Sequence, residues 1–132
     1  MTIPPLPHTL LQAIGRIEGY YVDGSRPSRN NNPGDLTYCA ETEAFGALHG
    51  DPRFAVFPDL ETGWDALRRW LSVPARVDPA GNLIHGYLGA TLAKALTRFA
   101  PPAENDSGNY LSLVCQWTGL SAATILTADL LV

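Results

Sequence analysis

The chain has 132 residues, of which 45% are hydrophobic and 17% are charged, as is ordinary for a globular protein. This length is most simply one domain, residues 1–132, and it can bury a core without disulfides or metal ions. The net charge of −4 gives no basic surface for nucleic acid or an anionic membrane. No segment approaches the roughly 18 to 20 apolar residues that a membrane span needs, so we expect no membrane insertion.

The first residues, Met1 to Pro7, lack the basic and apolar regions of a signal peptide, so we expect synthesis in the cytoplasm. Activity outside the cell would then require delivery by another system. Cys39 and Cys115 are far apart in sequence, and we expect two free thiols in a monomer. The three histidines stand alone without a second ligand at metal spacing, so we expect no metal and no other cofactor.

The first predicted helix runs from about Leu10 to Tyr20 or Tyr21, with Thr9 as its N-cap. Gly15 inside this helix indicates a close approach of the backbone to a neighbour. The buried stripe of the helix is predicted from four apolar residues at helical spacing: Leu10, Ile14, Ile17 and Tyr21.

The region after this helix predicts a polar, irregular segment over residues 23–31 and then a turn at Asn32-Pro33-Gly34. Proline fixes one backbone angle of this turn, and Gly34 is expected to take a positive φ. Three short strands are predicted next, at residues 36–40, 44–48 and 53–57.

The remaining elements are predicted to be helical, apart from a Gly- and Pro-marked connection over residues 75–88. The predicted helices are about Leu60 to Leu71 or Val73 with Asp59 as cap, Thr91 to Phe99, Asp106 or Ser107 to Gly119, and a short one near 123–126 after Ser121. The fold class is therefore α+β, mostly helical, with a small antiparallel sheet after the first long helix.

Glu18 is the candidate for catalytic chemistry. It stands beside the buried stripe at the end of the first helix, just before Gly19, which allows a sharp turn. A poorly hydrated carboxyl group that a cleft can reach is suited to act as a general acid. The alternative interpretation is a solvated glutamate on a helix surface.

Four sequence strings occur in a distinctive order: Ile17-Glu18-Gly19; Asn31-Asn32-Pro33-Gly34-Asp35-Leu36; Phe54-Ala55-Val56-Phe57-Pro58-Asp59 with Gly63 and Ala66; and Arg98-Phe99-Ala100-Pro101-Pro102-Ala103-Glu104-Asn105-Asp106 with Tyr110. Over about residues 10–120 they resemble small lytic transglycosylase-like proteins of phages and bacterial secretion systems, within the lysozyme-like superfamily. The chain differs from them at Asp35, where relatives usually have Asn. The fuller signature, Glu-Ser followed by Gly-Leu-Met-Gln, is absent.

The resemblance implies a lysozyme-like fold that cleaves the bond between N-acetylmuramic acid and N-acetylglucosamine in peptidoglycan, with Glu18 as acid and base. It also implies that Asn32 lines the cleft and that Tyr110 lies near the glutamate. The alternatives are a turn-stabilising role for Asn32 and a core position for Tyr110. Tyr38 and Phe57 could stack on sugar rings, although core packing is the competing role.

A single carboxyl group suffices for a lytic transglycosylase, because the sugar's own 6-hydroxyl closes an anhydro ring. A hydrolase would want a second carboxylate, and the nearby candidates lack a motif-like position: Asp23, Asp35, Glu41 and Glu43. The transglycosylase is therefore favoured over a lysozyme-type hydrolase. A catalytically silent glycan-binding or virion structural domain is the alternative from another class. The expected partner is the peptidoglycan glycan strand, reached through a phage particle or a secretion apparatus.

Overall fold

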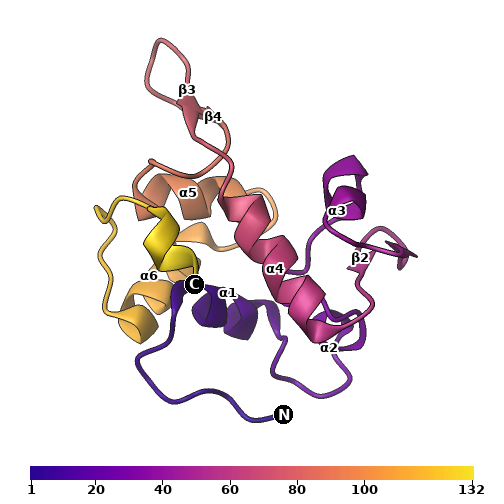
Figure 1. Ribbon diagram of the computed structural model, residues 1–132. Helices are drawn as coiled ribbons and strands as arrows, with labels where there is room; N and C mark the ends of the chain where they lie inside the picture. The colour runs from indigo at the N-terminus through magenta and orange to yellow at the C-terminus, as the bar shows by residue number, and fades with distance from the viewer. The chain divides into compact units, whose positions relative to one another are not determined.

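The computed structural model describes residues 1–132 as six α-helices, one 3-10 helix and two antiparallel sheets of two strands each (Figure 1). It confirms the prediction of a mostly helical α+β fold. The chain forms two compact units. The first unit comprises Met1–Pro5 and Ile14–Trp70, and the second comprises Leu6–Ala13 and Leu71–Val132. No helix combines the length and the apolar character that a membrane crossing requires.

Helix α1 (Leu10–Glu18) ends two or three residues earlier than predicted. Gly19 takes a φ of 91°, and its N–H donates to the Arg16 carbonyl at 3.2 Å. The Tyr20 N–H donates to the Gly15 carbonyl at 2.9 Å. These two bonds form a Schellman motif, the glycine-based arrangement that stops helices. Glu18 is therefore fixed as the last residue of the helix.

The early end of α1 changes its buried stripe. Ile14 is fully buried as predicted, but Ile17 and Tyr21 are only half-buried and Tyr20 is buried instead. The close approach expected at Gly15 is confirmed, because a Cβ there would lie 2.9 Å from the ring of Trp64.

The prediction that residues 23–31 lack regular structure was wrong, because α2 (Arg26–Arg29) forms there. Its N-cap Ser25 accepts a hydrogen bond from the Ser28 N–H, and Pro27 stands in the first turn, where its missing N–H costs nothing. A serine followed two residues later by proline was the available signal.

The first predicted strand is confirmed in part, because Thr37 forms an antiparallel bridge with Phe54 and the Tyr38 N–H donates to the Arg53 carbonyl at 2.7 Å. The second predicted strand was wrong. Helix α3 (Ala40–Ala44) occupies the end of the first and the start of the second. The Thr42 hydroxyl stabilises the start of this helix, because it accepts a hydrogen bond from the N–H of the N-cap residue Cys39 at 2.9 Å. The sheet instead pairs β1 (His49–Gly50) with β2 (Ala55–Val56), so the third predicted strand is confirmed in shortened form.

Helix α4 (Leu60–Leu71) agrees with its prediction, and the Asp59 carboxylate caps it by accepting from the Thr62 N–H at 2.8 Å. Its fourth residue, Gly63, lies against the Asn31 backbone. A Cβ at this position would stand only 1.7 Å from the Asn31 carbonyl oxygen. Only glycine therefore allows α4 to pack on the loop that carries Asn31.

In the second unit, α5 (Leu92–Phe99) and α6 (Ser107–Thr118) confirm their predictions, with Thr91 and Asp106 as side-chain caps. Gly119 stops α6 with a φ of 78°. The predicted connection before α5 contains an unexpected hairpin of β3 (Arg76–Val77) and β4 (Leu83–His85), which extends as a long loop beyond α5 in Figure 1.

The predicted helix at 123–126 was wrong, because this segment pairs with the start of α5 in extended form. The Leu92 N–H donates to the Thr124 carbonyl at 2.7 Å, and the Leu126 N–H donates to the Ala90 carbonyl at 2.8 Å. A 3-10 helix, η1 (Ala128–Leu131), follows and buries Leu131.

Candidate functional site

The candidate site lies in the first unit around Glu18. Its side chain is half-buried, consistent with the predicted position beside the apolar face. The Ser25 hydroxyl donates to the Gly19 carbonyl at 2.7 Å. The Ser25 hydroxyl oxygen also accepts a hydrogen bond from the Ser28 N–H. Ser25 therefore joins the end of α1 to the start of α2.

Arg26, the first residue of α2, forms a two-pronged ion pair with Asp35. Its Nε donates to one carboxylate oxygen at 3.1 Å and its Nη2 donates to the other at 2.5 Å. The guanidinium carbon also lies 3.6 Å from the centre of the Phe54 ring. Only 9% of the Asp35 side chain is exposed, against 43% for Arg26. Bidentate pairing and stacking together hold the guanidinium in one orientation.

The charges around Arg26 connect this pair to Glu18. The hydrogen bonds that Arg26 donates to Asp35 raise the pKa of Arg26, and the negative charges of Asp35, Glu18 and Asp51 raise it further, while burial opposes them. Arg26 is therefore a fixed cation that attracts the Glu18 carboxylate. Asp35 offsets much of that positive charge at close range.

Three consecutive asparagines join the loop after α2 to β2. The buried Asn32 side chain donates to the carbonyls of Leu36 and Ala55, both at 2.9 Å, and accepts from the Leu36 N–H at 2.9 Å. The Asn31 amide donates to the Phe57 carbonyl at 3.1 Å, and the Asn30 carbonyl accepts from the Phe57 N–H at 2.9 Å. Two of the strings that carry the resemblance are therefore hydrogen bonded to each other.

The backbone of this loop is strained on both sides of the turn. Asn31 and Asp35 take φ values of 50° and 48°, in the left-handed region that non-glycine residues rarely adopt. The expectation that Gly34 carries the positive φ was wrong. Gly34 instead packs closely on Leu67, because a Cβ there would lie 2.6 Å from a terminal methyl carbon of that side chain. Backbone strain of this kind clusters at functional sites.

The sequence-predicted site residues do not all lie in the same environment. Asn32 is 0% exposed and its amide is saturated, so it holds the loop instead of facing a ligand. Phe57 is 1% exposed, which leaves no ring face for a sugar. Tyr38 is half-buried, and its hydroxyl donates to Glu43 at 2.5 Å. Tyr110 is buried in α6 of the second unit.

Sequence reasoning brought Glu18 and Asp35 into the site but missed Arg26 and Ser25. Both appeared as part of a polar loop, because a four-residue helix has no measurable apolar periodicity. The signal that could have found Ser25 was its position as an N-cap before Pro27. Arg26 has no comparable local signal, because its partners, Asp35 and Phe54, are distant in sequence.

Comparison of the chain with models of known protein families gives no match, and comparison with curated proteins gives none either.

Proposed function

We propose that the protein is a peptidoglycan-cleaving lytic transglycosylase with a lysozyme-like fold. Glu18 would protonate the leaving oxygen of the bond between N-acetylmuramic acid and N-acetylglucosamine. The same carboxylate would then accept the proton of the 6-hydroxyl as the anhydro ring closes. Delivery to the wall by a phage particle or a secretion apparatus belongs to this proposal.

The observation that carries the proposal is the setting of Glu18. Glu18 is the last residue of α1, at a Schellman turn, and it is half-buried. Ser25 connects that turn to α2, where Arg26 pairs with Asp35 at the end of the strained loop. An acid fixed by rigid neighbours can keep its proton aimed at one position of a bound substrate.

Two of the four carboxylates that could make the protein a hydrolase are hydrogen bonded to neighbouring side chains, and the other two are exposed. Asp35 accepts from Arg26 with both oxygens, and 78% of the Asp23 side chain is exposed. Glu43 accepts from the Tyr38 hydroxyl, and Glu41 is exposed in the first turn of α3. These environments favour a mechanism that uses one carboxyl group, the transglycosylase route.

Replacing Glu18 with Gln tests the proposal most directly. Glutamine keeps the size of the side chain but cannot deliver a proton, a contribution typically worth about 10² to 10⁴ in rate. We expect Glu18→Gln to lose at least about a hundredfold in clearing of purified peptidoglycan suspensions. Glu61→Gln, the same change at an exposed position in α4, should keep wild-type activity.

Near-normal clearing by Glu18→Gln would show that another residue is the acid. A wild-type protein that binds chito-oligosaccharides but clears no peptidoglycan would instead support a silent glycan-binding domain.

The released products and Asp35 separate the transglycosylase from a lysozyme-type hydrolase. We expect muropeptides that end in 1,6-anhydro sugars, lighter by one water of about 18 Da than hydrolysed products.

Asp35→Asn should keep most of the rate, because asparagine also tolerates the left-handed backbone at this position. The alkaline limb of the pH–rate profile should move to lower pH, because Arg26 without its partner favours ionised Glu18. Fully hydrated products with an inactive Asp35→Asn variant would instead identify a hydrolase.

A further inference from the structure

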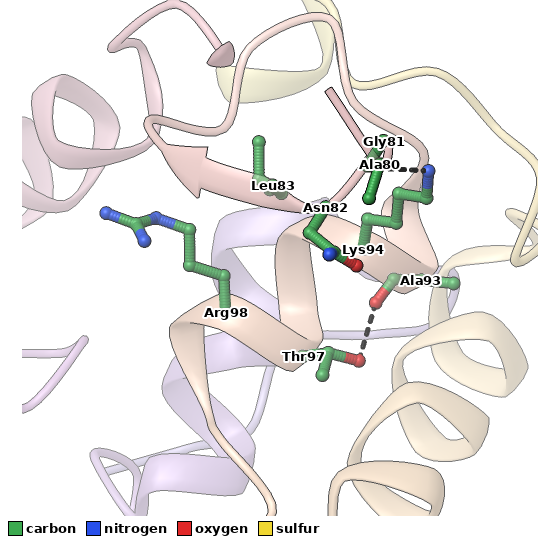
Figure 2. A pocket seen from close by; sticks show the side chains of 8 residues that line it. All are labelled: Ala80, Gly81, Asn82, Leu83, Ala93, Lys94, Thr97 and Arg98. Atoms are coloured by element: carbon green, nitrogen blue, oxygen red, sulfur yellow. Dashed lines mark hydrogen bonds between the residues drawn. The ribbon is translucent and has the colours of Figure 1, made fainter. Parts of the chain in front are cut away.

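A second feature with binding chemistry is a pocket in the second unit, between the β3–β4 hairpin and α5. It has a volume of about 500 Å³ and is shown in Figure 2. This volume is within the usual range of small-molecule sites. The hairpin contributes the chain from Ala80 to Leu83, and α5 contributes Ala93, Lys94, Thr97 and Arg98. None of the residues of the Glu18 site lines it.

The pocket is cationic in a protein whose net charge is −4. Lys94 and Arg98 are one helical turn apart on α5, and no carboxylate is among the lining residues. Asp78, the nearby acid of the hairpin, accepts from the N–H groups of Ala80 and Asn82 and from the Asn82 amide. Those hydrogen bonds lower the pKa of Asp78 and commit its oxygens to the turn.

The available donors are concentrated on α5. The Lys94 ammonium donates to the Gly81 carbonyl at 3.3 Å, a long bond that leaves its other two protons available. Arg98 lies with its guanidinium carbon 5.5 Å from the centre of the Tyr87 ring, at the other end of the lining in Figure 2. The Thr97 hydroxyl already donates to the Ala93 carbonyl at 2.8 Å, so it adds no donor.

The rest of the lining is mostly apolar. Ala80, Ala93 and Leu83 provide apolar contacts, Gly81 leaves backbone exposed, and Asn82 adds one polar amide. A bare phosphate would not use these walls, whereas a short peptide with small side chains and a terminal carboxylate would use both the walls and the charges.

We propose that this pocket binds the C-terminal carboxylate of a short, alanine-rich peptide. In peptidoglycan this ligand is the stem peptide, an attribution that rests on the proposed function. The site would hold the peptide part of the wall through Lys94 and Arg98, independently of cleavage at Glu18.

Titration calorimetry with Glu18→Gln protein tests this binding without cleavage. The probe is an acetylated tripeptide that ends in D-alanyl-D-alanine with a free carboxylate, compared with the same peptide as its C-terminal amide. We expect the amide to bind at least about tenfold more weakly, as expected for loss of a charged hydrogen-bonding partner. Equal binding of the two peptides, or no binding of either, would overturn the proposal without any variant in the pocket.

Pocket variants then locate the site. Lys94→Gln and Arg98→Gln should each weaken binding of the free carboxylate by at least about fivefold. Arg76→Gln removes an exposed cation of the same hairpin that does not line the pocket, and it should keep wild-type affinity. Equal losses in all three would indicate only general charge attraction and overturn the assignment. Because these assays measure binding, an inactive wild-type protein would refute the proposed function and leave this result standing.

Discussion

The loop region of the first unit and the helices of the second unit are stabilised by interactions of different range. In the first unit, Asn32 bonds to Ala55, 23 positions away, and Asn31 bonds to Phe57, 26 positions away. In the second unit, Thr91 and Asp106 cap their helices by accepting from an N–H three residues ahead. The first region therefore depends on tertiary contacts, whereas the helix boundaries of the second are determined by local sequence.

Adding a methyl group to one glycine in each unit should give the largest difference in stability between variants of the two units. In Gly63→Ala the new Cβ would meet the Asn31 carbonyl at 1.7 Å, and a backbone group cannot move aside cheaply. We expect a loss of about 4 kcal/mol or more in the free energy of unfolding, or failure to fold. Urea denaturation followed by circular dichroism measures it.

Gly108→Ala is the matched change in α6. The nearest atom to a Cβ there is 3.8 Å away, an ordinary contact, and alanine is the better helix former. This variant should be as stable as the wild type or gain up to about 1 kcal/mol. A Gly63→Ala variant that tolerates the methyl group equally well would show that α4 does not pack on the loop as described.

The range of interactions also explains which elements the sequence could predict. Helices α4, α5 and α6 were predicted because a cap such as Asp59 and a stop such as Gly119 stand next to the residues they control. The strand predicted at 44–48 failed because α3 ends at Ala44 and the chain then turns at Gly46, which has a φ of 108°. The Ala47 N–H closes this turn by donating to the Thr42 carbonyl at 2.9 Å. The β3–β4 hairpin was missed because its strands are short and largely exposed.

The candidate site could be predicted only in part. Glu18 and the turn after Asn31 were found, because the glycine after the acid and the Asn-Pro-Gly string are local signals. The roles of Asn32 and Phe57 depend on burial, which their residue types alone do not reveal. A buried asparagine and an asparagine that lines a cleft are the same residue type in the sequence, so only their hydrogen-bond partners in the structure distinguish them.

Removing one side-chain hydrogen-bonding group in each unit should give a smaller difference in stability between variants of the two units. Asn32→Ala leaves the Leu36 N–H and the carbonyls of Leu36 and Ala55 buried without this partner, and we expect a loss of about 3 kcal/mol. Asp106→Ala removes one exposed helix cap and should cost about 1 kcal/mol. Thermal or urea unfolding compares them, and equal losses would contradict the difference between tertiary and local control.

The smallest expected change in stability concerns Tyr21, which lies in the aromatic cluster beside the end of α1. Its ring lies 5.1 Å from that of Tyr20 and 6.5 Å from that of Trp64. Burial, with a smaller contribution from Tyr20, raises the pKa of Tyr21 from 10.0 to about 12. The unfolded chain therefore releases this proton at lower pH than the folded protein does. The stability contributed by neutral Tyr21 is fully present below about pH 10 and is lost as the pH rises toward about 12.

Tyr21→Phe should therefore lose less stability than the wild type between about pH 9 and about pH 11, because phenylalanine has no proton to release. Urea unfolding at these two pH values gives the difference, and absorbance titration of tyrosinate checks that one late-titrating group disappears. Tyr20 is also buried and its pKa is raised, so some loss of stability should persist in the variant. The same decline in both proteins would show that solvent reaches Tyr21 freely. The end of α1 would then be open beside Glu18, whereas the proposed acid needs a poorly hydrated setting.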